Sequence, residues 1–434
     1  MFLKFVYILY LFFIYKIGFD NFEETFKKIC IKLASMNILF VKILQWFTYD
    51  FTDDHELSER LFQYIQKYCN HVPYTKEDIN CNAMQSLQEL KDDSGNPIII
   101  MDTEPSFSGT IALCYLGEMN SKPVIIKVLR KNIESKLDEF EYILNYVLHI
   151  VYFIEYIGLI PKKTHLFMRQ VTESTSKSFK EQCNFEHECN TIEQFYSLYE
   201  SIEEIKIPQV YKEFTQLNKD VIVMEYLKPS YTISQLTEEQ ASIYIENLST
   251  FLITSYLTNF IFHNDVHLGN VLFLENEKNE LLVGIIDFGF VTAMNTIEEQ
   301  NICIDAWNIF FEKFDLKEGN DTLVVIGEFV IKQYYNYNSD SHKLEKLQQF
   351  VDNHRKKMKS LFKKIVKNNY FIELYVFLIK EDIRFPLTML NFISGISPII
   401  GSFLKLSEQM GGKCAVSILI SKLKENMNKY YQEY

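Results

Sequence analysis

Glycine, proline, tryptophan and cysteine are all sparse in this chain of 434 residues, which has 14 Gly, 9 Pro, 2 Trp and 8 Cys. The low glycine and proline content excludes a collagen-like, linker-dominated or disordered protein. The cysteines are scattered and form no C-x-x-C pair, so we expect reduced thiols and a reducing compartment. Hydrophobic residues make up 47% of the chain, which is enough for a sizeable core.

Basic residues are fewer than acidic ones. The chain has 44 Lys and Arg and 57 Asp and Glu, which gives a net charge of −13. An acidic chain repels phosphate backbones, so we expect no general nucleic-acid binding. At about 150 residues per domain, the length fits about three domains or one two-lobed enzyme with extensions.

Long hydrophobic runs are few, and one of them lies within residues 1–20. Its uninterrupted apolar part, Phe5–Tyr15, lies between Lys4 and Lys16 and is shorter than the about 20 residues of a spanning helix. Residues 1–19 reach about 28 Å if both lysines extend to the interface. No small-residue cleavage site follows, which disfavours a removed signal peptide. Two interpretations stay open: a membrane anchor, or an amphipathic helix packed on the core.

The rest of the chain alternates between helical and strand-like patterns, as in an α+β fold. Residues 21–95 are predicted to be helical. Residues 137–160 are predicted to form a buried helix rather than a membrane span, because His149 and Glu155 interrupt the apolar run. Predicted strands cover residues 97–101, 123–129, 220–226, 271–274 and 281–286, and further helices cover residues 237–262 and most of 296–434.

One constellation carries recognisable chemistry: His263-Asn-Asp265-Val-His267-Leu-Gly-Asn270, followed by Ile286-Asp287-Phe288-Gly289. This pattern indicates phosphoryl transfer, in which the protein mainly positions groups and balances charge. Asp265 is predicted to orient or deprotonate the attacking hydroxyl or water. Asn270 and Asp287 offer hard oxygen ligands to Mg²⁺, which needs few protein ligands when ATP phosphates complete its shell.

The other half of such a site is expected upstream. Lys127 lies among apolar strand residues, and a buried ammonium needs a partner, which ATP phosphates and a helix glutamate provide. Glu225 and Tyr226 are predicted at a hinge next to the nucleotide. His267 stands where a conventional kinase has a lysine that contacts phosphate, so the site carries less positive charge at neutral pH. This favours slow transfer or ATP hydrolysis.

The H-x-D-x-H-x-G-N string resembles the UbiB/AarF-type atypical kinase-like family, and the resemblance covers roughly residues 30–400. Phe40-Val-Lys42-Ile-Leu-Gln45-Trp46 is similar to the K-x-G-Q signature of that family, in a K-x-x-Q-W version. The resemblance implies that this helical extension folds over the active site, where Lys42 and Gln45 block large protein substrates. It also implies ATP and Mg²⁺ as cofactors.

Two more stretches support the resemblance. In Pro105-Ser-Phe-Ser-Gly-Thr-Ile111, the residues Ser108, Gly109 and Thr110 take the place of the Ala-rich nucleotide loop of the family, where small residues let backbone N–H groups approach phosphates. Further on, Gln182 and Asn184 match a regulatory Q-x-D pattern, and Glu188 matches the helix glutamate that pairs with Lys127. Asn184 replaces an aspartate, and an amide carries no charge to pair with Lys42 or a metal.

Alternatives stay open at several of these positions. A conventional-kinase alignment puts the partner of Lys127 at Glu139 or Glu141 instead of Glu188. Cys183, His187 and Cys189 are only three soft groups crowded on one helix, which disfavours zinc.

The basic stretch at residues 355–367 fits an ordinary solvated helix or a contact with an anionic membrane surface. Residues 386–405 are apolar, and we favour helices packed on the large lobe over a membrane span.

The predicted fold is α+β and bilobal, of the protein-kinase-like type. An apolar segment (1–20) and a helical extension (21–95) precede an N-lobe (96–228) and a C-lobe with a helical extension (229–434). The resemblance implies an atypical ATP-dependent kinase or ATPase, membrane-associated and linked to lipid or quinone metabolism. The alternatives are a small-molecule kinase of the aminoglycoside/choline kinase type and a nucleotide-binding pseudokinase scaffold. The organelle, the acceptor and the oligomeric state do not follow from the sequence.

Overall fold

The structure is a computed structural model of the 434-residue chain. It describes residues 22–41, 64, 72–89, 98–101, 104–158, 164–301, 303–305 and 341–360, and scattered residues between 377 and 425. The apolar segment 1–19, both Lys42 and Gln45, and most of the stretch 386–405 lie outside the described residues.

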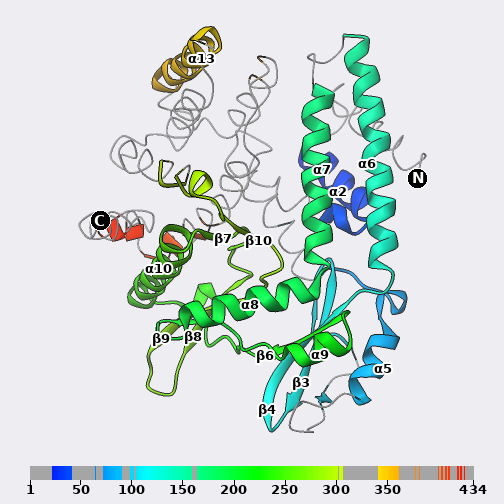
Figure 1. The fold of residues 1–434 in the computed structure, drawn as a ribbon, viewed down its shortest axis with the longest axis vertical. Helices are drawn as coiled ribbons and strands as arrows, with labels where there is room; N and C mark the ends of the chain where they lie inside the picture. The colour runs from blue at the N-terminus through cyan, green and yellow to red at the C-terminus, as the bar shows by residue number, and fades with distance from the viewer. Residues whose placement is uncertain are drawn as a thin grey trace. The chain divides into compact units, whose positions relative to one another are not determined.

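The chain divides into two compact units (Figure 1). The first unit holds the chain up to Cys183 together with Glu213–Val223, and the second holds Asn184–Lys212 and most of the chain from Met224 onward. The change of unit at Val223 and Met224 lies close to the hinge predicted at residue 228. The helix that begins at residue 185 belongs to the second unit, although the sequence analysis grouped it with residues 96–228.

An antiparallel sheet forms the centre of the first unit. Its strand order is β1-β3-β4-β6, with β2 paired to β3. In the hairpin of β3 and β4, Asn120 and Ser121 both have positive φ angles, as a tight turn between twisted strands requires. Alternate β4 residues are buried, so Lys127 shares the opposite, half-exposed face of the strand. The strand bounds are Ile99–Ile100 for β1, Phe107–Ser108 for β2, Ala112–Met119 for β3, Lys122–Leu129 for β4 and Val221–Glu225 for β6.

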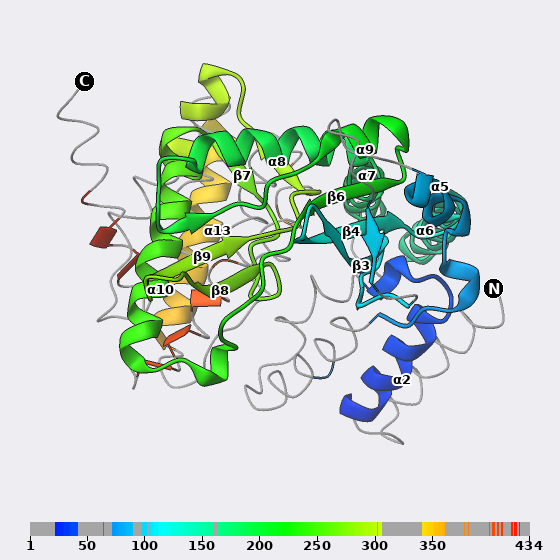
Figure 2. The same cartoon turned by 90° about the horizontal axis from the view of Figure 1, so that it is seen from below.

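Helices α6 and α7 form a long antiparallel pair in the first unit, with α2 beside them (Figures 1 and 2). The ring of Phe140 on α6 lies 5.4 Å from Phe179 on α7 and 5.0 Å from Phe40, which follows α2. The remaining helices of this part are short. The bounds are Phe22–Ala34 for α2, Cys81–Glu89 for α5, Ile133–Tyr156 for α6, Thr164–Gln182 for α7 and Lys212–Leu217 for α9.

The sequence analysis predicted a buried helix at residues 137–160, and the structure corrects this in part. Helix α6 is present, but only one face of it is buried. Tyr142, Phe153 and Tyr156 expose 63%, 60% and 79% of their surface. Apolar composition predicted burial, yet the neighbouring elements cover only one side of this helix. Among the helices that the structure describes, none combines the length and hydropathy of a membrane-crossing segment.

A buried ion pair fixes the loop before β3. The guanidinium of Arg130 lies 3.4 Å from the Asp78 carboxylate, which also binds Lys136. Arg130 donates to the Gly109 carbonyl from Nε (3.0 Å) and Nη2 (2.8 Å), and to Ser108 Oγ at 3.0 Å. Burial raises the pKa of Asp78, but the hydrogen bonds from Lys136 and the Thr75 amide and the nearby positive charges outweigh it and lower the pKa overall.

We predict that Arg130→Met lowers the free energy of unfolding by about 3–5 kcal/mol, because it removes one of the two positive partners of the buried Asp78 carboxylate and both side-chain donors to the Gly109 carbonyl. Chemical denaturation followed by circular dichroism measures this. The neighbouring exposed residue provides the control, since Lys131→Met should change stability by less than about 0.5 kcal/mol. Equal effects of the two substitutions would show that the ion pair does not hold this loop.

The second unit is built around a small sheet covered by helices. Strand β9 pairs in parallel with β5 and antiparallel with β8, and α10 lies beside this sheet (Figure 2). The two strands predicted at residues 271–274 and 281–286 are confirmed as a hairpin. A separate antiparallel pair joins β7 and β10. The bounds are Phe185–Tyr199 for α8, Ile205–Lys206 for β5, Glu238–Leu252 for α10, Ile261–His263 for β7, Val271–Glu275 for β8, Leu281–Ile285 for β9, Val291–Ala293 for β10 and Ser341–Ser360 for α13.

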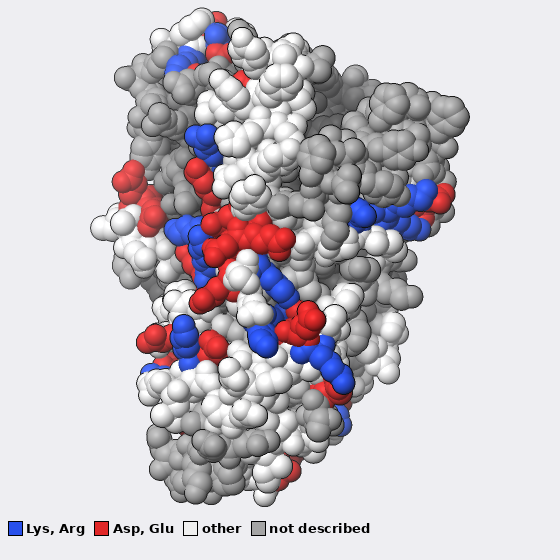
Figure 3. Space-filling view, turned by 90° about the vertical axis from the view of Figure 1, so that its right-hand side faces the viewer, with Lys and Arg blue, Asp and Glu red and all other residues white. Residues whose placement is uncertain are grey.

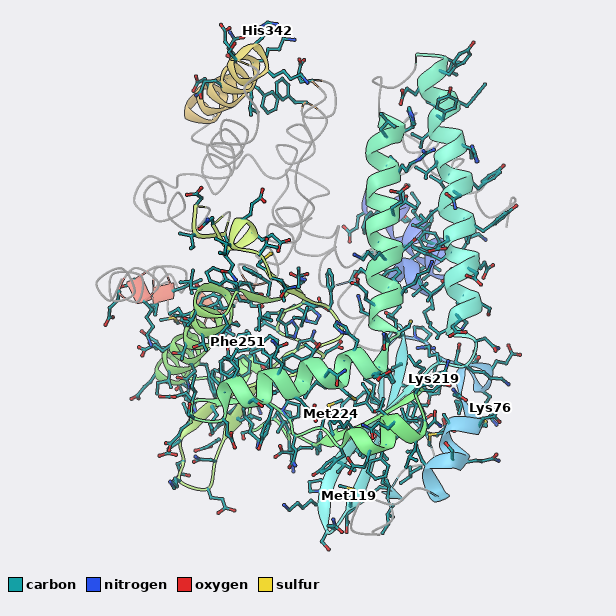
Figure 4. All side chains as sticks on the ribbon, in the orientation of Figure 1. Lys76, Met119, Lys219, Met224, Phe251 and His342 are labelled. Carbon is teal, nitrogen blue, oxygen red and sulfur yellow. The ribbon has the colours of Figure 1, made fainter. Side chains whose placement is uncertain are left out.

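Aromatic side chains fill the core between α8 and α10. Phe251 on α10 (labelled in Figure 4) stacks on Phe195 and Tyr199 of α8 at centroid distances of 6.0 and 5.1 Å. The Tyr199 hydroxyl donates to the Phe251 carbonyl at 2.6 Å, and burial raises its pKa. Helix α10 begins at Thr237, whose hydroxyl accepts the Gln240 amide and caps the helix. This core supports two loops, one after β7 and one after β9.

Candidate functional site

His263 ends strand β7 and is completely buried. Its Nδ1 accepts the Asp265 amide at 3.2 Å, so the proton lies on Nε2, which donates to the Ile286 carbonyl at 3.2 Å. Burial lowers the pKa of His263, although the carboxylates of Asp265 and Asp287 oppose this. The imidazole is therefore a neutral link between the loop after β7 and the end of β9, and it has no direct access to solvent.

The loop after His263 is tied to itself by a short series of hydrogen bonds. The Asp265 carbonyl accepts the His267 amide and the Asn270 side-chain Nδ2, each at 2.9 Å. The Asn270 amide donates to the His267 carbonyl at 2.8 Å. Since Nδ2 of Asn270 is used in the loop, its other polar atom, Oδ1, is the hard oxygen that suits Mg²⁺.

His267 has a defined orientation in this loop. Its Nδ1 accepts the Gly269 amide at 2.9 Å, and its Nε2 lies 3.6 Å from Asp265 Oδ1. A Cβ atom on Gly269 would lie 2.7–2.9 Å from the His267 ring, so only glycine fits beside this imidazole. The three predicted residues Asp265, His267 and Asn270 are thus brought together by the structure.

Asp287 follows β9 and adopts a φ of 63°, a left-handed conformation that costs a non-glycine residue of order 1 kcal/mol or more. The next residue holds it there. Phe288 is fully buried, with its ring 4.8 Å from Phe195 and 5.0 Å from His263. The Asp287 side chain is half-exposed, and the buried ring of its neighbour Phe288 anchors the loop that contains it.

Sequence reasoning missed the residues that support this site. Phe195 on α8 and Phe288 enclose His263, and the Tyr256 hydroxyl donates to the His263 carbonyl. Asn264 donates to Thr292 Oγ1 at 2.7 Å and so ties the loop to β10. The aromatic residues of α8 recur at helical spacing, which is a signal for core packing, but no local pattern shows which loop they contact.

Glu188 lies seven residues before Phe195 on α8, hence on the same helix face, and it is completely buried. Asn184 is the N-cap of this helix, because its Oδ1 accepts the His187 amide at 3.1 Å. An aspartate performs the same capping, so the replacement inferred from the sequence keeps the helix start. Gln182, at the end of α7, is buried and donates to Ser178 Oγ at 3.1 Å.

The small residues of the predicted nucleotide loop form hydrogen bonds with other groups of the protein. The Ser108 hydroxyl donates to the Val72 carbonyl at 2.6 Å and accepts from Arg130. The Gly109 amide donates to the Ala112 carbonyl at 2.9 Å, and Thr110 is buried. Of the backbone N–H groups expected to approach phosphate, the Gly109 amide is therefore engaged inside the loop. The nucleotide role of these three residues stays a prediction.

The other predicted positions are distributed over both units. Lys127 lies in the first unit opposite Cys114 on β3, so its pairing with Glu188 of the second unit stays a prediction. The alternative partner Glu141 pairs with Lys180 at 2.6 Å, and Glu139 is exposed.

The predicted hinge residues have local partners as well. The Glu225 carboxylate binds Lys206 at 3.0 Å and accepts the Gln209 amide at 3.2 Å, while Tyr226 is half-buried. Within the described part of the chain, no cluster of His, Cys, Asp and Glu side chains has the make-up of a metal centre.

The region that contains this site is similar in sequence to known proteins. The family model for the ABC1 atypical kinase-like domain matches residues 67–317, which contain every predicted site residue except Lys42 and Gln45. Probable protein kinase UbiB of Vibrio cholerae is 23% identical over 244 residues, covering 54% of this chain and 43% of the relative. The Arabidopsis thaliana protein ACTIVITY OF BC1 COMPLEX KINASE 8, chloroplastic, is 22% identical over 320 residues, covering 69% of this chain and 39% of the relative.

The matched regions thus amount to less than half the length of these curated relatives. Among solved structures, the complex of Rv3197 with erythromycin from Mycobacterium tuberculosis matches 83% of this chain and 95% of that chain, with 15% identity and a TM-score of 0.39. The family match confirms the kinase-like α+β fold and the resemblance stated from the motifs.

We predict that Phe288→Ala lowers the free energy of unfolding by about 3–5 kcal/mol, because it empties the space between Phe195 and His263. Denaturant titration measures the change. Phe288→Leu keeps most of the buried volume and should cost under about half as much. A Phe288→Ala protein as stable as the wild type would contradict the anchoring role of this ring.

Proposed function

Because the chain belongs to the ABC1 atypical kinase-like family, we propose that it is an ATP-dependent kinase or ATPase of the UbiB/AarF type that uses Mg²⁺. The observation that carries this proposal is the ordered loop of Asp265, His267 and Asn270, joined through buried His263 to the strand end that presents Asp287. Hard oxygen donors on two fixed loops are the protein contribution that phosphoryl transfer requires.

The residues present fit a magnesium ion. Asn270 is held with Nδ2 in the loop, so Oδ1 remains as the ligand atom, and Asp287 adds a carboxylate whose backbone is fixed by Phe288. Both would hold Mg²⁺, which neutralises phosphate charge when bound. In the proposal, Lys127 and Glu188 fix the ATP phosphates, on the basis of the family resemblance.

Asp265 is the proposed group that orients the attacking hydroxyl or water and accepts its proton. Its backbone carbonyl is already tied by two hydrogen bonds, so the position of the carboxylate is set by the loop. His267 Nε2 lies 3.6 Å from that carboxylate. An imidazole carries less charge than the lysine of conventional kinases at neutral pH, which supports slow transfer or ATP hydrolysis.

Membrane association and a link to lipid or quinone metabolism are part of the same proposal. The apolar run Phe5–Tyr15 between two lysines supports a membrane anchor, and the UbiB/AarF resemblance supports the lipid or quinone link. A small hydrophobic acceptor at the membrane would then be the phosphoryl acceptor or the activator of ATP hydrolysis.

A second candidate function is a nucleotide-binding scaffold without turnover. The contact of Gly109 favours it, because this backbone amide, of the kind expected to approach phosphate, donates inside the loop instead. Binding of ATP without phosphate release would identify the scaffold, whereas Mg²⁺-dependent phosphate release on liposomes would identify the enzyme.

We predict that Asp287→Asn reduces Mg²⁺-dependent ATP affinity at least about tenfold, since an amide replaces a charged metal ligand. Calorimetric titration of ATP with Mg²⁺ and with EDTA measures this. Glu277→Gln, which removes the same charge from an exposed residue of the β8–β9 loop, is the matched control and should bind as the wild type does. Unchanged metal-dependent affinity of Asp287→Asn would refute the metal role.

We predict that deletion of residues 1–19 moves the protein from the membrane pellet to the supernatant after cell fractionation, because the apolar run no longer enters the bilayer. Full-length protein is the control in the same experiment. Persistent pelleting of a folded, truncated chain would show that this segment is not the anchor.

A further inference from the structure

Helix α6 carries an exposed, uncharged face. Its positions 142, 146, 149, 153 and 156 follow one another at intervals of four and three residues, which places them on one side of a helix. Tyr152 and Ile157 border the same side and are exposed, and the Tyr152 ring also lies 5.0 Å from the His165 ring on α7. We call this the aromatic face of α6. It consists of Tyr142, Tyr146, His149, Tyr152, Phe153, Tyr156 and Ile157.

The face is unusual within this protein. Nearly half of the large hydrophobic side chains that are exposed among the described residues lie on it. Figure 3 views the side on which α6 lies in Figure 1 and shows acidic side chains gathered below uncharged surface. The opposite side of α6 packs on the ring of Phe179 through Phe140, so that side anchors the helix.

The area of the face matches what a pair of protein molecules needs. At about 200 Å² for each fully exposed large side chain, the exposed fractions of its six hydrophobic members give about 700 Å². Two copies of the face would bury about 1,400 Å², which is within the range of specific protein interfaces. Exposed apolar patches of this size on soluble surfaces mark interaction sites.

The face is symmetric about its middle. Tyr142 and Tyr156 both lie seven residues from His149, while Tyr146 lies three residues before it and Phe153 four after it. A two-fold axis through His149 therefore sets Tyr142 of one copy against Tyr156 of the other. Contacts of one patch with itself require such matched positions, and tyrosine is enriched in protein interfaces.

Charge disfavours an anionic membrane as the occupant. Helix α6 has five acidic residues and only one basic residue, Lys136, whereas helices that lie on anionic membranes carry Lys and Arg beside their apolar face. We propose that the aromatic face of α6 binds a second copy of this chain, with the two α6 helices antiparallel and centred on His149. This contact is independent of the proposed catalytic function.

Sedimentation velocity of the full-length protein, from about 1 to 50 µM, tests the contact, since interfaces of this size bind with micromolar or tighter affinity. The wild type should be dimeric in the upper part of this range. The double substitution Tyr146→Glu with Phe153→Glu should weaken the dimer at least about a hundredfold, because carboxylates then face each other across the axis. The matched control, Leu217→Glu with Ile297→Glu, changes two exposed hydrophobic residues outside α6 and should leave the dimer intact.

Disulfide cross-linking tests the orientation. In a background with Cys81→Ser, which removes an exposed cysteine, His149→Cys should cross-link two copies on oxidation. Glu139→Cys is the control: in the antiparallel contact it faces a position twenty residues along the chain of the other copy and should not cross-link with itself. Cross-linking at both positions would overturn the antiparallel arrangement.

Three results would overturn the proposal. The first is a wild type that stays monomeric at 50 µM. The second is equal weakening of the dimer by the α6 variant and by its control. The third is a monomeric protein that binds phosphatidylcholine vesicles and loses this binding in the α6 variant, which would assign the face to a lipid surface. Circular dichroism of each variant confirms that it is folded.

Discussion

The burial of Phe288 between Phe195 and His263 is the contact on which the geometry of the site depends. The Phe288 ring is enclosed on both sides and cannot move without opening a cavity. Asp287, the residue before it, is therefore held at a φ of 63°, which is unfavourable for an aspartate. The same contact fixes the neutral His263, whose two nitrogens connect the loop of Asp265 to the end of β9. Packing thereby positions two polar loops that have little hydrophobic content of their own.

In the first unit, a buried ion pair fixes the position of a loop. Arg130 and Asp78 are buried together, and the arginine binds the loop of Ser108 and Gly109 from inside. A buried guanidinium is stable only when most of its donors are used, and here they are used on backbone carbonyls. The cost is that small residues predicted to approach phosphate are engaged in the protein. The contact explains why this loop is ordered although it contains no Gly-rich repeat.

The two exposed features of the molecule have different origins. The half-exposed Asp287 and His267 are polar and lie in loops, as chemistry requires. The aromatic face of α6 is uncharged and lies on a helix whose other side already packs on Phe179. An exposed apolar surface of this size marks an interaction site, which our proposal assigns to a second copy of the chain.

Short-range pattern was sufficient for much of this protein. The spacing of His263, Asp265, His267 and Asn270, followed by Asp287 after a strand, predicted the site loop and the kinase-like fold. The first four residues lie within eight positions of one another, so local backbone geometry sets their relative positions. The two strands of the hairpin at residues 271–286 were predicted from two short apolar runs separated by a polar loop, which is also a local pattern.

Tertiary structure alone decided which side of α6 is buried, which loop Phe195 supports, and that Arg130 closes the loop at Gly109. Each of these depends on residues far apart in the chain, and the periodicity of a helix shows which face packs but not which distant segment it packs against.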